Sequence, residues 1–453
     1  MNTEITLRKP NIMSHTIYDF TKDKFAWYAD EIIRDTNRNV FLTGKAGTGK
    51  SELLKFIIKT IHKNFIVLAP TGAAAVNIGG STFHNFLGLP NSIFDINNNS
   101  KIGNKISKQS KEVIKSLEIL FVDEVSMVRA DLIDATDHIF KKIRGCNLPF
   151  GGVQIVLVGD LYQLPPVVMS NDKFDLLKNY ESEFFFDSMV FKKIDIIKIG
   201  LKKVYRQSDS GFVELLDRVR TNNITCADVE SLNKRANIKI PFSNLPLLTL
   251  TTKNCIAELI NERELKKLYG ECYTFKPIVK GEWKGEKPFE DTLRLKEGAK
   301  VIFTKNYYAG TYYNGMMGTV KRIDEKQGIL IVTEDNEFWV DRVNWKYQEF
   351  CLKDNKIIRV NRGEYLQYPL KLGFAITIHK SQGLTLERVH IDLGTGTFAS
   401  GQLYVALSRC KSLDGIFLSS IIRDRDFKAN SKVKRFLEDI NDYKLKAALS
   451  EIV

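Results

Sequence analysis

The chain alternates short, almost wholly apolar runs with segments of helical periodicity. Apolar runs occur at "NVFLT" (39–43), "FIVLA" (65–69), "LEILFV" (117–122) and "VQIVLV" (153–158), and each is followed by Gly, Pro or Asp. After the first run, "SELLKFIIKTIHK" (51–63) places its apolar residues three or four positions apart, as in an amphipathic helix. Continuous apolar runs between such helices are typical of parallel strands buried on both faces. The pattern predicts an α/β fold.

The same pattern returns further along the chain, but it is interrupted. "LPLLTLTTKNCIAELINERELKKL" (245–268) predicts a strand, a turn and an amphipathic helix. Strands resume in "PLKLGFAITIHKSQG" (369–383) and "VHIDLG" (389–394), and "GQLYVALSR" (401–409) predicts a helix. Between them, residues 275–368 contain short β-like runs separated by Gly, Asn and Asp turns, which indicates a small β-barrel.

A glycine-rich loop, "GKAGTGKS" (44–51), lies between the first strand and the first helix. In this context the pattern G-x-x-x-x-G-K-S binds a nucleoside triphosphate. Its glycines let backbone N–H groups face the phosphates at the helix N-terminus, Lys50 reaches the β- and γ-phosphates, and Ser51 binds Mg²⁺. The residues expected to hold the nucleotide here are Gly44, Ala46, Gly47, Thr48, Gly49, Lys50 and Ser51.

Two carboxylates follow the third apolar run, and a glutamine follows the fourth. In a P-loop enzyme, Asp123 would hold Mg²⁺ and Glu124 would polarise the attacking water, which favours hydrolysis over transfer to an acceptor. Alone, such a pair can also simply end a strand at the surface. Gln163, in "GDLYQLPPV", can reach along the carboxyl edge of a parallel sheet to sense the γ-phosphate.

The segment "FIVLAPTGAAAVNIGGSTFHNFLGL" (65–89) offers a second group of donors. Pro70 and Thr71, with the small residues after them, expose backbone and hydroxyl groups that can grip a phosphodiester. Glycines and alanines also permit close packing, so both interpretations stay open for this segment.

Composition narrows the possible functions. At 453 residues, with 43% hydrophobic and 27% charged residues, the chain is globular and long enough for about three domains. No segment approaches the ~20 apolar residues of a membrane span, so we expect no membrane partner. The six cysteines are scattered, which argues against a zinc ribbon, an iron–sulfur cluster or a disulfide framework and favours a reducing cytosol. The net charge of +13 is a modest hint of a polyanionic partner.

Taken together, the motifs occur in the order seen in superfamily-one helicases. The chain most resembles the petite-integration-frequency (Pif) family of superfamily 1B, related to the Dda and RecD-like helicases, from about residue 40 to 420. The matching motifs are "GKAGTGKS", "APTGAAA", "GGSTFHNFLGL", "DEVSM", "GDLYQLPPV", "YRQ" (205–207), "GFAITIHKSQGLTLERVHIDLG" (373–394) and "LYVALSRC" (403–410).

The resemblance implies an α/β architecture with two RecA-like P-loop domains, each with a parallel sheet. It also implies a small wedge insertion and an SH3-like β-barrel insertion. The expected domains are 1–200 for the N-terminal helix and first RecA-like domain, with the wedge at about 88–115; 201–274 and 369–440 for the second RecA-like domain; and 275–368 for the SH3-like domain.

Hydrolysis needs a cation from outside the P-loop domain, because charge develops on the γ-phosphoryl group. Arg206 and Arg409 match the arginine-finger positions of the family, and we expect the second domain or the hinge to carry them. The predicted catalytic set is Lys50, Glu124, Gln163, Arg206 and Arg409. The resemblance also assigns Gln382 and Gly383 to the nucleotide site.

One departure from the family concerns the base of the nucleotide. The helix that normally carries an adenine-reading Gln corresponds here to "KDKFAWYADEII" (22–33), which contains none. We expect adenine to stack on Phe25 or Tyr28, and selectivity for ATP over GTP stays open. The expected cofactors are ATP and Mg²⁺, the metal being held by Ser51 and Asp123.

Candidate contacts to nucleic acid come from a group of aromatics, from the resemblance and from a run of lysines. The aromatics in "NYYAGTYYNG", Tyr307 and Tyr312 among them, lie between lysines and suit base stacking, although a place in the barrel core is equally compatible. By resemblance, His84, Phe86, Thr377, His379 and Lys380 lie near the DNA or couple it to the nucleotide. Lysines at 101, 105, 108, 111 and 115 form one basic stripe on a helix, which binds DNA or is a solvated face.

The expected function is an ATP-dependent DNA helicase that moves along single-stranded DNA and separates the duplex ahead of it. The resemblance implies 5′-to-3′ polarity, action at single-strand/duplex junctions, and roles such as DNA repair, recombination and telomere maintenance. The alternative is a nucleic-acid-stimulated ATPase that remodels protein–DNA or RNA–DNA complexes without processive unwinding. G-quadruplex and RNA–DNA hybrid substrates stay open. We expect a monomer, cytoplasmic in a prokaryote or phage and nuclear in a eukaryote.

Overall fold

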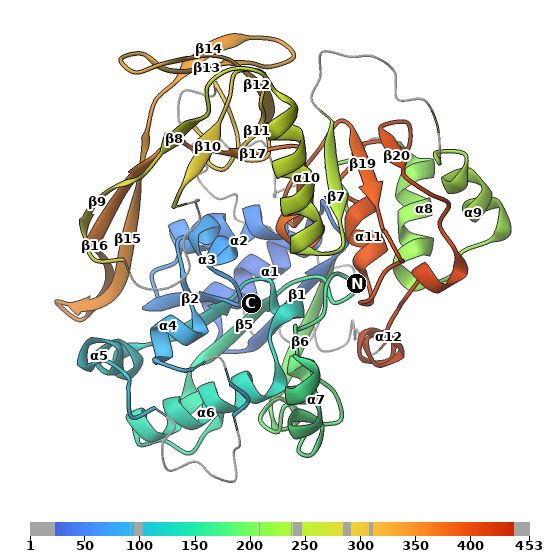
Figure 1. The fold of residues 1–453 in the computed structure, drawn as a ribbon. Coiled ribbons are helices and arrows are strands. Elements are labelled where there is room, and N and C mark those ends of the chain that lie inside the picture. The colour runs from blue at the N-terminus through green and yellow to red at the C-terminus, as the bar shows by residue number, and fades with distance from the viewer. Residues whose placement is uncertain are drawn as a thin grey trace, which may run out of the picture.

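The computed structural model describes residues 23–90, 92–94, 103–207, 209–236, 238, 247–283, 291–307 and 311–438 of the chain. The described residues contain two parallel sheets and three antiparallel sheets (Figure 1). Within it, no helix combines the length and the apolar character that crossing a membrane requires. Of the residues discussed above, Lys101 and Tyr308 lie outside the described residues, as does part of the expected wedge at 88–115.

The first sheet has six parallel strands in the order β3-β2-β4-β5-β1-β6. They are β1 (Asn39–Gly44), β2 (Phe65–Ala69), β3 (Ser81–Thr82), β4 (Ile119–Val122), β5 (Gln154–Val158) and β6 (Ile196–Leu201). The helices are α1 (Lys24–Asp35), α2 (Lys50–Thr60), α3 (Gly72–Ile78), α4 (Phe83–Leu87), α5 (Lys108–Ser116), α6 (Ala130–Arg144) and α7 (Ser170–Leu177). Val40 and Leu42 pack in one buried cluster with Leu53 of α2, whereas Phe41 packs in another with Phe140 of α6. Both faces of the sheet are therefore covered, which explains the continuous apolar runs and confirms the α/β class.

The second sheet is also parallel, with the order β18-β7-β19-β20. Its strands are β7 (Leu248–Thr251), β18 (Ala375–Thr377), β19 (Val389–Asp392) and β20 (Ile416–Leu418). The helices of this region are α8 (Ser210–Thr221), α9 (Cys226–Asn233), α10 (Asn254–Lys267) and α11 (Gln402–Leu407); α12 (Ser431–Glu438) follows them in the chain but packs on the first unit. Leu250 of β7 shares a core with Phe212 of α8 and Leu403 of α11. β7 and β18 are neighbours in the sheet although they are far apart in the chain. The segment between them is therefore an insertion into this unit.

The segment between β7 and β18 forms three antiparallel sheets. Five strands have the order β14-β13-β12-β11-β17, three the order β15-β16-β9, and two form β10-β8. The bounds are β8 (Tyr273–Phe275), β9 (Ile278–Gly281), β10 (Leu293–Leu295), β11 (Lys300–Phe303), β12 (Met317–Asp324), β13 (Gly328–Val332), β14 (Glu337–Val340), β15 (Val343–Lys353), β16 (Lys356–Gln367) and β17 (Leu370–Leu372). Because β17 pairs with β11, the antiparallel region continues past the expected boundary at 368.

The long β15–β16 hairpin reaches the first sheet's unit. Gln109 of α5 donates to the carbonyl of Phe350 at 2.7 Å and accepts from Arg362 at 2.6 Å. Asn85 donates to the Tyr347 hydroxyl at 3.0 Å. The antiparallel region therefore touches both parallel-sheet units.

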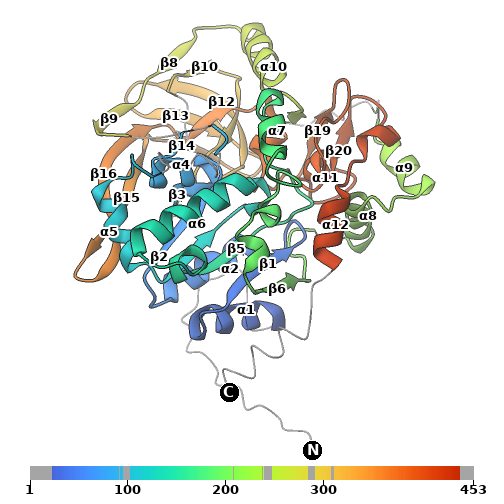
Figure 2. The same cartoon turned by 90° about the horizontal axis from the view of Figure 1, so that it is seen from below.

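Helix α12 lies away from the sheet to which the expected boundaries assign it. The Phe436 ring stacks on Phe186 with centroids 4.5 Å apart, and it also contacts Phe41 and Phe185 of the first unit's core. Figure 2 shows α12, in red, beside the elements of the first sheet. Phe436 completes this aromatic cluster, and the packing of its ring explains why the chain returns to the first unit after β20.

Candidate active site

The loop that joins β1 to α2 has the backbone of a phosphate-binding loop. Gly47 and Gly49 have φ angles of 80° and 81°, which favour glycine. A Cβ on Gly47 would lie 2.6 Å from the Cβ of Arg206, so the loop packs directly against the segment that follows β6. Ser51, in the first turn of α2, is exposed, whereas Thr48 is buried. The loop thus leads into a helix N-terminus with an exposed serine in its first turn, an arrangement that suits phosphate binding.

Lys50 is enclosed by this loop. Its Nζ donates to the carbonyl oxygens of Gly44 at 2.7 Å and Lys45 at 2.9 Å. Burial lowers the pKa of Lys50, and Asp160 and Glu124 oppose that shift. The ammonium group is therefore held where backbone amides and acidic side chains converge.

The two carboxylates after β4 are adjacent in the chain: Asp123 is buried and Glu124 is half-buried. Glu124 has a φ of 49°, a left-handed conformation that is strained for a side chain of this type, and its N–H donates to Asp123 Oδ1 at 2.9 Å. Burial raises the pKa of Asp123, and the neighbouring Glu124 raises it further. Burial also raises the pKa of Glu124, against the attraction of Lys50 and Arg409. A carboxylate with a raised pKa is suited to accept a proton.

Gln163 lies after β5 and joins the two parallel-sheet units. Its Nε2 is 3.4 Å from Asp160 Oδ2, and its Oε1 accepts from Gln382 Nε2 at 3.4 Å. Gln382 follows the short turn after β18, and Gly383 is exposed beside it. The expected γ-phosphate sensor is therefore in contact with the second unit.

Both predicted arginines lie at the cleft. The backbone N–H of Tyr205 donates to the carbonyl of Gly47 at 2.8 Å, which fixes Arg206 against the P-loop. Arg206 Nη1 donates to the Ser408 carbonyl at 3.3 Å. Arg409 is 1% exposed and donates to the carbonyls of Val405 and Ser381. Burial lowers the pKa of Arg409 to about 9, and the nearby Arg206 adds to this shift.

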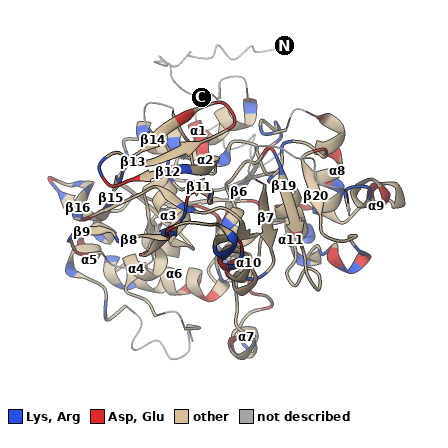
Figure 3. Cartoon of the chain, turned by 45° about the horizontal axis from the view of Figure 1, so that its top comes forward, with Lys and Arg blue, Asp and Glu red and all other residues tan. Residues whose placement is uncertain are grey.

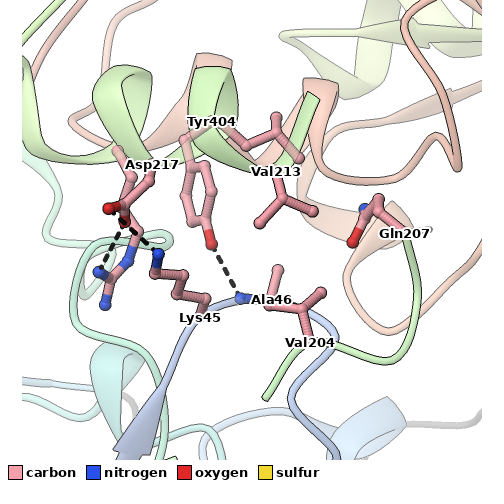
Figure 4. A pocket seen from close by; sticks show the side chains of 9 residues that line it. Lys45, Ala46, Val204, Gln207, Val213, Asp217 and Tyr404 are labelled. Carbon is pink, nitrogen blue, oxygen red and sulfur yellow. Dashed lines mark hydrogen bonds and ion pairs between the residues drawn. The ribbon is translucent and has the colours of Figure 1, made fainter. Parts of the chain in front are cut away.

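Sequence reasoning missed a group of residues that closes the P-loop from the other side. Lys45 Nζ is 3.1 Å from Asp217 Oδ2, and the Ala46 N–H donates to the Tyr404 hydroxyl at 2.8 Å. These residues line a pocket between the P-loop and helices α8 and α11 (Figure 4). Tyr404 lies within the motif "LYVALSRC", which also contains Arg409. Its place in that motif is the one signal in the sequence that could have identified it as a site residue.

The expected base-binding residues lie on α1. Phe25 is partly exposed, and Lys202 Nζ lies 4.8 Å from the centre of its ring. Tyr28 is edge-on to Phe25 with centroids 6.4 Å apart. Stacking of adenine on either ring stays a prediction.

Residues expected at the strand divide into accessible and buried groups. Pro70 and Thr71 follow β2, and the Thr71 hydroxyl accepts from Ala74 N–H as the cap of α3. His379 and Lys380 follow β18, with Lys380 exposed. The His379 ring is parallel to that of Phe398, a residue missed from the sequence, which is 58% exposed.

Three residues expected to contact the strand have buried side chains in this structure, and their contact with the strand stays a prediction. Phe86 is 6% exposed in the first unit's core, and Thr377 is 3% exposed with its hydroxyl accepting from the Lys380 N–H. Tyr312 is 5% exposed and stacks on Phe303 with centroids 4.4 Å apart, so it belongs to the core of the antiparallel region. By contrast, Tyr307 is 48% exposed, and His84 is partly exposed.

The basic stripe is solvent-facing along its described length. Lys108, Lys111 and Lys115 of α5 are exposed, whereas Val113 and Ile114 of the same helix are buried; Lys105 is also exposed but precedes the helix. Figure 3 draws the Lys and Arg residues of the chain in blue. The stripe flanks the contact between α5 and the β15–β16 hairpin.

Comparison with known proteins gives consistent results. Residues 21–226 match the family model of PIF1-like helicases. The chain is 33% identical to the ATP-dependent DNA helicase PIF1 of Xenopus laevis over 391 residues, which cover 84% of this chain and 59% of that protein. It therefore spans about three fifths of the length of that relative.

Two solved structures of Bacteroides Pif1 are similar to this one. The complex with ADP-AlF4 has a TM-score of 0.86 at 34% identity, covering 94% of this chain and 97% of that chain. The complex with single-stranded DNA has a TM-score of 0.68 at the same identity and coverage. The arrangement described here is therefore closer to that of the ADP-AlF4 complex than to that of the strand complex, and an unliganded structure of the same protein matches almost as well, with a TM-score of 0.84.

Proposed function

The chain belongs to the family of PIF1-like helicases, and on that premise we propose that it is an ATP-dependent DNA helicase. It would move along single-stranded DNA in the 5′-to-3′ direction and separate the duplex at a junction. The observation that carries this proposal is that Arg206 and Arg409 meet Lys50 and Glu124 at one P-loop, with Arg409 contributed from beside α11 of the second unit. Such a site is complete only while the two parallel-sheet units are in contact.

The chemistry follows from this convergence. The P-loop amides and Lys50 would hold the phosphates, and Glu124, with its raised pKa, would accept a proton from the attacking water. The two arginines would balance the charge that develops on the γ-phosphoryl group. Ser51 and Asp123 offer the hydroxyl and carboxylate oxygens that suit Mg²⁺, which would neutralise phosphate charge when bound. This donor set supports ATP and Mg²⁺ as the cofactors.

A short turn after β18 supports coupling between strand and nucleotide. Lys380 is exposed on the side expected to face the strand, the carbonyl of Ser381 accepts from Arg409, and Gln382 bonds to Gln163. Three consecutive residues thus connect a DNA contact, an arginine finger and the γ-phosphate sensor. A shift of the turn on strand binding would move both catalytic side chains, which is how a gated motor couples hydrolysis to translocation.

The strand itself is proposed as the partner by analogy. A Bacteroides relative is described as bound to ssDNA, and its lower TM-score supports a different arrangement of the units when the strand is bound. We propose that one chain suffices as the motor, because it supplies both sides of the cleft.

Unwinding of forked duplexes tests the proposal. We expect ATP-dependent separation of a duplex that carries a 5′ single-stranded tail. A duplex that carries only a 3′ tail should be separated little. Lys50→Ala is the control and should abolish both. Strand-stimulated hydrolysis without unwinding would contradict the helicase proposal and favour remodelling of protein–DNA or RNA–DNA complexes.

A further inference from the structure

The buried Asp160 is the centre of a polar cluster that the mechanism above does not use. It follows β5 in the first unit and is fully buried. Oδ1 accepts from Arg220 Nη2 at 3.1 Å and from the Tyr162 N–H at 3.2 Å, and Oδ2 accepts from the Tyr404 hydroxyl at 3.2 Å. Burial alone would raise the pKa of Asp160, but Arg220 and Lys50 together hold it below its ordinary value. The carboxylate is therefore ionised and needs these donors.

Two of those donors come from the other side of the cleft. Arg220 lies on α8 and Tyr404 on α11, and both helices belong to the core of the second unit. The Tyr404 hydroxyl donates to Asp160 and also accepts the Ala46 N–H of the P-loop at 2.8 Å. The Tyr404 hydroxyl thus bonds both to the P-loop backbone and to Asp160. The same Asp160 oxygen, Oδ2, also accepts a hydrogen bond from Gln163.

We propose that Tyr404 is a positioning residue whose hydroxyl fastens the P-loop to the second unit through Ala46 and Asp160, so that closing the cleft sets the loop backbone and Gln163 for phosphate transfer. The inference rests on the proposed ATP hydrolysis. When the cleft opens, water replaces the Tyr404 hydroxyl at Ala46 and Asp160; when it closes, both groups are buried and need this partner. The hydroxyl therefore stabilises the closed state and leaves the open one unaffected.

Removing only the hydroxyl separates this role from packing. Tyr404→Phe keeps the ring in the second unit's core, where the side chain is 3% exposed. We expect affinity for ADP, which needs no closed cleft, to stay within about twofold. Affinity for ADP with aluminium fluoride and kcat for ATP should each fall about 10-fold, which equals about 1.4 kcal/mol and is the scale of one buried hydrogen bond. The KM for ATP should change by less than about threefold.

The experiment measures both nucleotide affinities by calorimetry, with Mg²⁺, for the full chain and its variants. Tyr269→Phe is the matched control, because Tyr269 is 94% exposed and loses the same atom. Arg220→Lys, which keeps a charge beside Asp160, should shift the two affinities in the same unequal way and carries the test if Tyr404→Phe does not fold.

The outcomes are distinguishable. An unequal loss in Tyr404→Phe, with the control unchanged, supports the inference. Equal loss of both affinities, or no loss, overturns it, because either result means that the hydroxyl does not distinguish the closed state. If the unaltered chain neither hydrolyses ATP nor binds ADP more tightly with aluminium fluoride, the proposed function fails and this inference fails with it.

Discussion

At the scale of single residues, Glu124 combines a strained backbone with a half-buried acidic side chain. A group whose pKa is higher in the folded than in the unfolded chain binds protons more tightly when folded. Stability therefore falls as pH rises from the unfolded value of about 4.3 through the folded pKa. Because burial raises the pKa of Glu124, the nucleotide-free protein should be destabilised by this carboxylate at neutral and alkaline pH.

Glu124→Gln tests that reasoning. Without Mg²⁺ and nucleotide, we expect the variant to unfold about 1–3 °C higher than the unaltered chain at pH 8. The difference should shrink at pH 5, where more of the carboxyl is protonated, and hydrolysis should be lost at both pH values. Thermal melts at the two pH values measure this; a variant that melts lower than the unaltered chain at pH 8 would contradict the expectation that the Glu124 carboxylate destabilises the nucleotide-free protein.

The sequence predicts residues of this site well where each has a local signal. Lys50, Glu124 and Gln163 each follow a recognisable strand, so their places in the cleft were expected. Asp160 and Tyr404 were not, because their roles depend on a contact between segments that are 244 positions apart. Phe86 and Tyr312 were expected at the strand but are buried here, because the sequence alone does not distinguish an aromatic residue of a core from one on a surface.

At the scale of elements, the N-terminus of α11 approaches the loop after β5 very closely. Gly401 has a φ of 72°, and a Cβ there would lie 2.2 Å from the carbonyl oxygen of Tyr162 and 2.5 Å from that of Gln163. These two carbonyl groups belong to the backbone, which cannot move aside as a flexible side chain could. The two units can therefore close fully only with glycine at this position.

Gly401→Ala should accordingly hold the cleft slightly open. We expect ATP hydrolysis to fall at least ~10-fold, or about 1.4 kcal/mol. Gly394→Ala is the control for backbone strain alone, since Gly394 has a φ of 58° but no atom within 4 Å of its Cβ position, and its activity should stay within about twofold. Steady-state kinetics of both variants decide the point; equal losses would mean that strain, not the close approach, sets the effect.

Helix α12 shows how far sequence can assign an element. Its residues are compatible with an amphipathic helix, but nothing in them says which sheet it covers. The decision comes from Phe436, which completes an aromatic cluster built by Phe185 and Phe186. The cluster forms only in three dimensions, so a boundary drawn from sequence order placed α12 with the wrong unit.

At the scale of the whole molecule, three of the contacts between the units illustrate what connects them. The Tyr404–Asp160 cluster and the Gln163–Gln382 pair join the parallel-sheet units, and the β15–β16 hairpin joins the antiparallel region to α5. The alternation of apolar runs predicted both parallel sheets. The hairpin's contact with α5 could not be predicted, because it depends on how far two long strands project from their sheet.

We expect hydrolysis at the P-loop to depend on strand binding at the second unit. Steady-state ATP hydrolysis, with and without a single-stranded oligonucleotide and with Glu124→Gln as control, measures this dependence. We predict that the oligonucleotide raises the rate at least ~10-fold, about 1.4 kcal/mol off the barrier, and that the control is inactive while it still binds ATP. A rate that does not change when the strand is added would contradict the account.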